Sequence, residues 1–258
     1  WDKPLLRGIF VLGESLVLGW RALSISADIA LEEESQGKGM GWIEKTVSIV
    51  LALALTIGLF IALPTWLAPR MVGHDSPVWL WNLVEGGMRI AFFVAYLLLV
   101  SLSREMRRVF EYHGAEHKVI NAYEAGRPLE PQSVKAFSTL HPRCGTAFLL
   151  VVMVLAILVL ALVGKPPLVW LIVSRIVGIP VVAGLAYEVI RFAGRHRDGI
   201  VARVLLGPGL GLQKLTTRQP SDAQVEVAAA ALQEVLRLEA GGEPAGDPAG
   251  TVVMEQAT

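Results

Sequence analysis

The chain has 258 residues, of which 53% are hydrophobic and 18% are charged, and its apolar residues are clustered in long runs, which indicates a membrane protein. Lysine plus arginine and aspartate plus glutamate both total 23, so the formal net charge is zero and a nucleic-acid partner is not expected. A single cysteine excludes an internal disulfide and fits a reducing compartment.

Residues 5–27 are apolar but carry Arg7, Glu14 and Arg21 seven residues apart, which predicts an amphipathic helix with these charges near one face. Such a helix either lies at the membrane interface or against the bundle with its charged edge in water, or lines a polar cavity as a re-entrant element. Residues 28–45 combine an acidic run with glycines and predict a solvated linker.

Four later stretches approach or exceed the roughly 20 apolar residues that cross the hydrocarbon core of a bilayer as a helix. They are residues 46–68, 78–100, 146–164 and 167–190. The predicted fold class is therefore an all-α, polytopic membrane protein with four transmembrane helices, the N-terminal amphipathic helix and a cytoplasmic helical segment.

The distribution of cations predicts the topology. Five of the 23 lysines and arginines lie in residues 1–45, seven in 101–145 and seven after 190, whereas the connectors 69–77 and 165–166 hold one each. Because short loops rich in lysine and arginine stay in the cytoplasm, both termini and the segment 101–145 are expected on the cytoplasmic side of the inner membrane.

Charged residues also occur inside the predicted spans. Asn82, Glu85 and Arg89 share one face of the second span, and Arg175 and Glu188 lie in the fourth. An unpaired ion there costs about 3 kcal/mol, so Glu85 and Arg89 are expected to pair or to face the bundle. Either these groups form structural ion pairs, or they line a hydrophilic groove for a lipid headgroup or a peptide.

The cytoplasmic segment contains the motif HGAEH. Residues 103–125 predict a helix that continues the second span, and Gly126 and Pro128 supply its end. On this helix His113, Glu116 and His117 share a face, so the two imidazoles can bind one divalent ion while Glu116 takes a proton from a bound water.

A second pair of candidate ligands, His141 and Cys144, lies in HPRCG just before the third span. A helix N-terminus beyond Pro142 would favour the thiolate of Cys144. The simplest assembly is a tetrahedral site for Zn²⁺ or Fe²⁺ made of three histidines and Cys144; alternatively one of the four is unbound and a water takes its place.

The simpler interpretation needs no metal: His113 and His117 bond to Glu111, Glu116 or lipid phosphate, and Cys144 is a small buried hydrophobic residue. The remaining histidines, His74 and His196, are expected to be solvated surface residues.

After the fourth span, arginines mixed with apolar residues predict a segment along the inner leaflet. Ser221 and Gln224 then form a capping box, and Val225, Ala228 and Leu232 begin an apolar stripe that is expected to dock on the cytoplasmic segment of the same chain or on a partner.

The whole chain divides into an N-terminal region 1–45, a first hairpin 46–100, the metal-site segment 101–145, a second hairpin 146–190, a cytoplasmic segment and helix 191–240, and a disordered tail 241–258.

The runs REMRRVFEYHGAEHKVINAYEAG, FSTLHPRCGTAFLLVVM and PVVAGLAYEVIRFAGR resemble the YqhQ-like family of bacterial membrane proteins, a domain of unknown function, over nearly the whole chain. The family label implies a metal near His113, Glu116, His117, His141 and Cys144 but names no reaction. Family members carry a glycine-rich segment of the G-G-Q-A-V-I-E-G type before the first helix, which this chain lacks, and the resemblance leaves open whether it adds a ligand.

Two functions follow as expectations. As a metal-dependent hydrolase at the membrane surface, the chain would use Glu116 as general base and Arg143 to steady a developing anion or a lipid phosphate. As a non-catalytic protein with a structural metal, it would dock on or regulate another membrane assembly, such as protein insertion or export machinery, or form a homo-oligomer.

Overall fold

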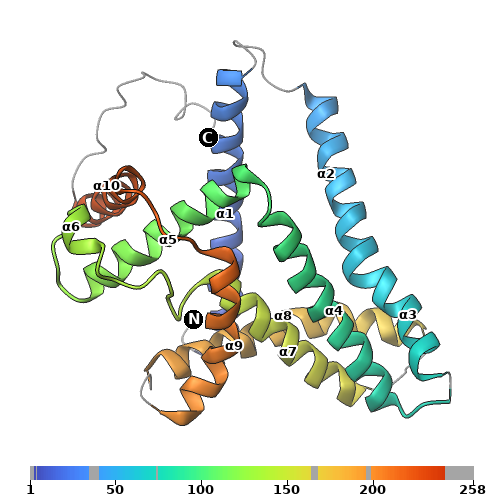
Figure 1. The fold of residues 1–258 in the computed structure, drawn as a ribbon. Coiled ribbons are helices and arrows are strands. Elements are labelled where there is room, and N and C mark those ends of the chain that lie inside the picture. Colours follow the sequence, from blue (N-terminus) through green and yellow to red (C-terminus); the bar gives the residue numbers. More distant parts are fainter. Residues whose placement is uncertain are drawn as a thin grey trace. The chain divides into compact units, whose positions relative to one another are not determined.

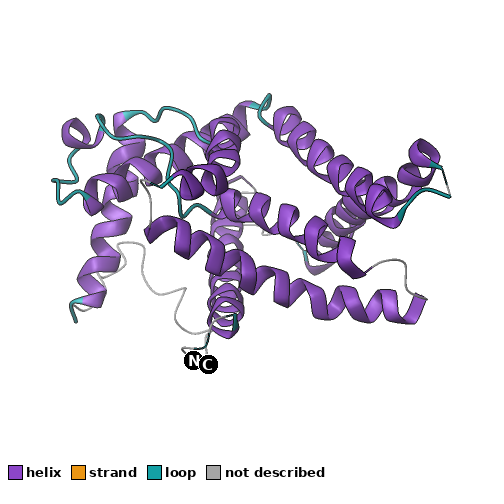
Figure 2. Ribbon diagram, turned by 90° about the horizontal axis from the view of Figure 1, so that it is seen from below, coloured by secondary structure: helices purple, strands orange, loops and turns teal. Residues whose placement is uncertain are grey.

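The computed structural model describes residues 3, 5–34, 41–73, 75–163, 168–195 and 199–241, and helix is the only regular secondary structure in these ranges (Figure 2). The all-α class is therefore confirmed. The helices are α1 (Leu6–Glu34), α2 (Trp42–Ile57), the π-helix η1 (Gly58–Ala62), α3 (Leu63–Val72), α4 (Val78–Val100), α5 (Arg104–Glu124), α6 (Pro131–Val134), α7 (Gly145–Val163), α8 (Leu168–Arg195), α9 (Ile200–Thr216) and α10 (Asp222–Glu239) (Figure 1).

Several expectations fall outside the described residues: those for His74, for His196, for the part of the linker at 35–40 and for the tail from 242 onward. The linker expected at 28–45 begins later than predicted, because α1 extends to Glu34. Glutamate has a high helix propensity, so the acidic run prolongs the helix instead of ending it.

The chain forms two compact units. The apolar unit comprises Trp1–Leu99 and Pro142–Leu212, and the α5–α10 unit comprises Val100–His141 and Gln213–Thr258. The structure thus groups the chain into fewer units than the division expected from the sequence. Each unit is built from segments that lie far apart in the sequence.

Three helical stretches of the described chain are long and apolar enough to cross a membrane: Leu6–Ile29, Trp42–Val72 and Val78–Val100, with mean hydropathies of 1.4, 2.6 and 1.8. The last two correspond to the first two expected spans. Leu6–Ile29 was expected to be an amphipathic interfacial or re-entrant helix, but by length and composition it also qualifies as a span. The third and fourth expected spans correspond to α7 and α8, which flank residues 164–167, outside the described part.

In the apolar unit, α8 packs against both α7 and α1. Small residues allow α1 to approach closely: a Cβ added at Gly8 would lie 2.8 Å from a side-chain atom of Tyr187. Arg7 of α1 donates both Nε and a terminal nitrogen to the carboxylate of Glu188 in α8, with Nε 2.7 Å from Oε1. Glu188 therefore has its ionic partner in α1, which satisfies a charge that would be costly in an apolar bundle.

The polar face of α4 forms the ion pair that the sequence predicted. Arg89 donates to the Glu85 carboxylate one helical turn earlier, and the Thr65 hydroxyl of α3 donates to the same oxygen at 2.7 Å. Glu85 is 3% exposed, so its charge is neutralised and bonded inside the apolar unit.

The α5–α10 unit begins where α4 ends. The helix expected to run unbroken from the second span is interrupted, because Ser103 takes an extended backbone conformation and its hydroxyl accepts the Met106 N–H. This side-chain cap starts α5 as a separate helix. The predicted stop at Gly126 is confirmed, since this residue adopts the left-handed conformation with φ of 64°.

The helix α10 packs on α5 and α6, which confirms docking within the same chain. Its capping box is present: the Ser221 hydroxyl accepts the Gln224 N–H, and the Gln224 side chain accepts the Ser221 N–H. The buried core of this unit joins α5, α6 and α10 and consists of Ala115, Val119, Ala122, Val134, Val225 and Ala229.

Candidate metal centre

Helix α5 places His113 and His117 one turn apart on the same face, as their spacing predicts. Their rings meet edge to face, with centroids 4.4 Å apart and planes at 67°. His117 is buried at 5% exposure and His113 is half-buried. The ligand nitrogens that the two rings offer lie within 4.8 Å of each other.

Backbone carbonyls fix the tautomer of both rings. His113 Nδ1 lies 2.8 Å from the Thr216 carbonyl oxygen, and His117 Nδ1 lies 2.6 Å from that of Thr139. A carbonyl can only accept, so each Nδ1 carries the hydrogen, and in the neutral ring Nε2 carries the lone pair.

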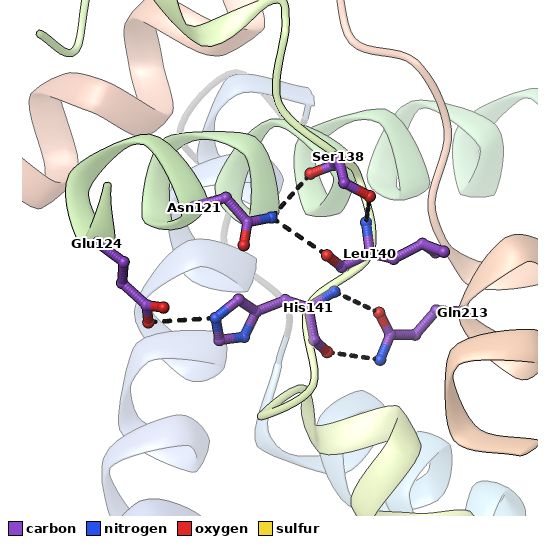
Figure 3. Close-up of polar contacts among 6 residues, drawn as sticks. All are labelled: Asn121, Glu124, Ser138, Leu140, His141 and Gln213. Carbon is purple, nitrogen blue, oxygen red and sulfur yellow. Dashed lines mark hydrogen bonds and ion pairs between the residues drawn. The ribbon is translucent and has the colours of Figure 1, made fainter. Parts of the chain in front are cut away.

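His141 joins the pair from outside α5. Its ring centroid lies 5.9 Å from that of His117, and the residue is only 6% exposed. Its Nε2 faces Glu124 Oε1 at 3.3 Å, which directs the Nε2 hydrogen toward the carboxylate (Figure 3). Gln213 holds the His141 backbone at both ends: Oε1 accepts the N–H at 2.9 Å and Nε2 donates to the carbonyl at 2.8 Å (Figure 3).

Two further α5 side chains bind the segment 135–141. Lys118 Nζ donates two bonds of 2.7 Å. Asn121 Nδ2 donates bonds of 2.9 and 3.1 Å, which Figure 3 shows. Lys118 is 5% exposed, and this burial lowers the pKa of its ammonium group from the usual 10.5. The accepting carbonyls are those of Lys135, Phe137, Ser138 and Leu140. These hydrogen bonds hold the segment that carries His141 against α5.

Three other residues were predicted for this site: Glu116, Arg143 and Cys144. Glu116 is on α5 but exposed, unlike His117 beside it. Arg143 and Cys144 belong to the apolar unit, where Arg143 is exposed and Cys144 is 8% exposed with Sγ 3.2 Å from Thr146 Oγ1. Helix α7 begins directly after Cys144, so Pro142 lies in the preceding turn and not at the first helical position. The cysteine nevertheless stands at a helix N-terminus, as predicted.

Sequence reasoning missed most of the groups that orient the histidines. A signal existed on α5, because His113, His117, Asn121 and Glu124 follow one another at intervals of four, four and three residues and so form a polar stripe. No local signal points to Gln213, since it lies 72 residues from His141 in the sequence.

Comparison with known proteins gives one family and one curated relative. The model of the family described as "Protein of unknown function (DUF1385)" matches residues 3–238. The chain is 35% identical over 266 residues to "Uncharacterized protein YqhQ" of Bacillus subtilis (strain 168), an alignment that covers 97% of this chain and 82% of the relative. No solved structure matches the chain.

Proposed function

Because the chain belongs to the DUF1385 family of proteins of unknown function, its activity has to be inferred from its own site, and we propose that its histidines bind a divalent transition metal. His113, His117 and His141 are the proposed ligands, and Zn²⁺ or Fe²⁺ is the ion that this donor set suits. The site belongs to an inner-membrane protein, on the cytoplasmic side that the cation distribution indicates.

One observation carries this proposal: each of the three rings has one nitrogen committed to an acceptor. Two donate to backbone carbonyls and the third to the Glu124 carboxylate. Metal-ligating histidines almost always donate their second nitrogen in this way, because the bond sets the tautomer and the orientation of the ring. Solvated surface histidines require no such arrangement.

The distances are compatible with a shared ion. Two nitrogens bound to one Zn²⁺ at about 2.1 Å each are at most about 4.2 Å apart. In a tetrahedral site the two nitrogens are about 3.4 Å apart. One ring nitrogen of His113 and one of His117 lie within 4.8 Å of each other, so a shift of at most about 1.4 Å brings them to one ion. Small side-chain rotations supply such a shift.

Cys144 remains the proposed fourth ligand on grounds of chain length. It follows His141 by three residues, so their Cα atoms are at most about 11 Å apart. A site made of the three histidines and Cys144 would be closed. A site made of the three histidines alone would leave one position for a water, and the metal there would supply Lewis-acid activation of that water.

We favour a metal-dependent hydrolase acting at the membrane surface, with Glu116 as general base and Arg143 as the anion-stabilising cation. The segment 135–141 is already bound to α5 by Lys118 and Asn121, and to α9 by Gln213, so a metal would add little as a structural link. A preorganised, hydrogen-bonded ligand set is what catalysis requires.

The alternative is a structural metal in a protein that docks on another membrane assembly or on a second copy. Two observations favour it: His117 and His141 are deeply buried, and Glu116 points into solvent. A closed four-ligand site would then stabilise the α5–α10 unit outright.

Elemental analysis of the full chain, purified in detergent without chelators and under reducing conditions, tests the metal. About one Zn or Fe per wild-type chain is expected, with loss in His117→Ala and His113→Ala and retention in the control His74→Ala. A metal-free wild type refutes both versions.

Glu116→Gln then separates the two versions. In a hydrolase it abolishes the ability of the chain to replace the wild type in cells, while metal content and fold are kept. In a structural site the substitution is nearly silent, whereas Cys144→Ser releases the metal and loosens the α5–α10 unit.

A further inference from the structure

A second feature of the α5–α10 unit is a cavity of about 330 Å³ that the histidines do not line. It is formed by residues 138–140 together with Lys214 and residues 217–219. These are the segments whose carbonyls, at Thr139 and Thr216, accept the hydrogens of His117 and His113. The cavity walls are therefore held by the same bonds that orient the candidate metal ligands.

The lining is positively charged. It contains two cations, Lys214 and Arg218, four uncharged polar residues and one leucine, and no acidic residue. The neighbouring sequence adds no negative side chain, since residues 135–141 and 200–220 lack aspartate and glutamate. Within the described part of the chain, neither cation forms an ion pair.

The C-terminus of α9 lies beside the cavity and would by itself repel an anion. Two of its last four carbonyls accept hydrogen bonds, however. The Gln213 carbonyl accepts both the N–H and the hydroxyl of Thr217, at 2.7 and 2.8 Å, and the Thr216 carbonyl accepts from His113. These bonds weaken the partial negative charge at the helix C-terminus. The two full positive charges of Lys214 and Arg218 therefore outweigh it, and the cavity favours an anion.

Arg218 is fixed at its backbone. Its N–H donates to the Phe110 carbonyl at 2.9 Å, which anchors the residue against α5 while the exposed side chain lines the cavity. A guanidinium presents a planar fork of donors that matches two oxygens of a phosphate group, and a lysine adds a point charge.

We infer that this cavity binds a phosphate group, carried either by a soluble phosphate ester or by a phospholipid headgroup. Its volume lies near the lower end of the roughly 300–1,000 Å³ range of small-molecule sites, which suits a phosphate with a small polar substituent. The inference goes beyond the proposed metal function and does not depend on it, because Lys214 and Arg218 are not metal ligands.

Calorimetric titration of inorganic phosphate into the full chain in phosphatidylcholine nanodiscs tests this site. The wild type is expected to bind, and Lys214→Gln with Arg218→Gln to weaken binding about a hundredfold, since each charge-assisted contact is worth about a factor of ten. The control Lys135→Gln with Arg237→Gln removes the same charge from the same unit at two residues that do not line the cavity, and is expected to bind as the wild type does.

The source of the phosphate is decided by repeating the titration in nanodiscs that also contain phosphatidic acid, with enough salt to screen the bilayer surface. Competition by the lipid identifies a headgroup, and unchanged binding identifies a soluble ester; both support the site. No binding by the wild type, or equal weakening in the cavity variant and the control, overturns it. Metal content measured on the same samples shows whether the histidine site has been disturbed separately.

Discussion

Gly114→Ala tests how closely α5 approaches the segment that ends α9. A Cβ at residue 114 would lie 2.0 Å from the Arg218 carbonyl oxygen and 3.1 Å from its carbonyl carbon. These are backbone atoms and cannot rotate away, so the segment 216–218 has to move by more than 1 Å. That movement breaks the bond from Arg218 N–H to Phe110 and shifts the Thr216 carbonyl away from His113.

The sign of the effect is opposite to that expected from helix propensity. Glycine to alanine inside a helix stabilises by about 1 kcal/mol. Overpacking costs about 1–3 kcal/mol, and each lost hydrogen bond costs about 1 kcal/mol. The net expectation is a destabilisation of about 1–3 kcal/mol. If His113 binds the proposed metal, the variant is also expected to bind it more weakly.

Hydrogen exchange of the detergent-solubilised chain measures this locally. Amides of α5 and of residues 216–218 are expected to exchange between about 5-fold and about 150-fold faster in Gly114→Ala, since each 1.4 kcal/mol corresponds to a factor of ten. The matched control is Gly211→Ala, because a Cβ there meets nothing within 4 Å, and it is expected to be neutral or protective. Unchanged or slower exchange in Gly114→Ala would refute the close approach.

Two further predictions concern the polar groups around the candidate site. Gln213→Leu leaves the buried N–H and carbonyl of His141 without their bonds and is expected to lower the stability by about 2–5 kcal/mol. Gln213→Glu is expected to be intermediate, because it keeps the acceptor. Pulse proteolysis of residues 126–141 measures the difference, and equal resistance in the wild type and both variants would show that Gln213 does not hold His141 in place. Burial lowers the pKa of Lys118 below 10.5, so the folded chain binds fewer protons than the unfolded chain and its stability rises as the pH increases through the window that ends at 10.5. Lys118→Met is expected to abolish this rise between neutral pH and about pH 10 in the same proteolysis assay, and a persisting rise would assign it to another group.

Several features followed from local sequence patterns. Long apolar runs identified helices that are long and apolar enough to cross a membrane, and the Ser221–Gln224 spacing identified the start of α10 and its docking face. The interval of four residues placed His113 and His117 on one face of α5. Each of these depends on the period of a helix and on residues close together in the chain, which is information that a single sequence carries.

The break between α4 and α5 was missed although its cause is local. Ser103 is a good N-cap residue, but a serine within a continuous polar and apolar pattern is equally compatible with an unbroken helix. The structure decides between them, because the Ser103 hydroxyl accepts the Met106 N–H and α5 begins anew.

The sequence by itself determined the all-α class, the presence of helices long and apolar enough to cross a membrane, and the pairing of histidines on one helical turn, because these follow from hydrophobicity and helical period. Only the tertiary structure decided which groups fix those histidines and which charges pair. Arg7 and Glu188 are 181 residues apart in the sequence, and Gln213 and His141 are 72 apart. Such pairs arise from the packing of whole helices, whose free energy is spread over many side chains, so no short stretch of sequence encodes them.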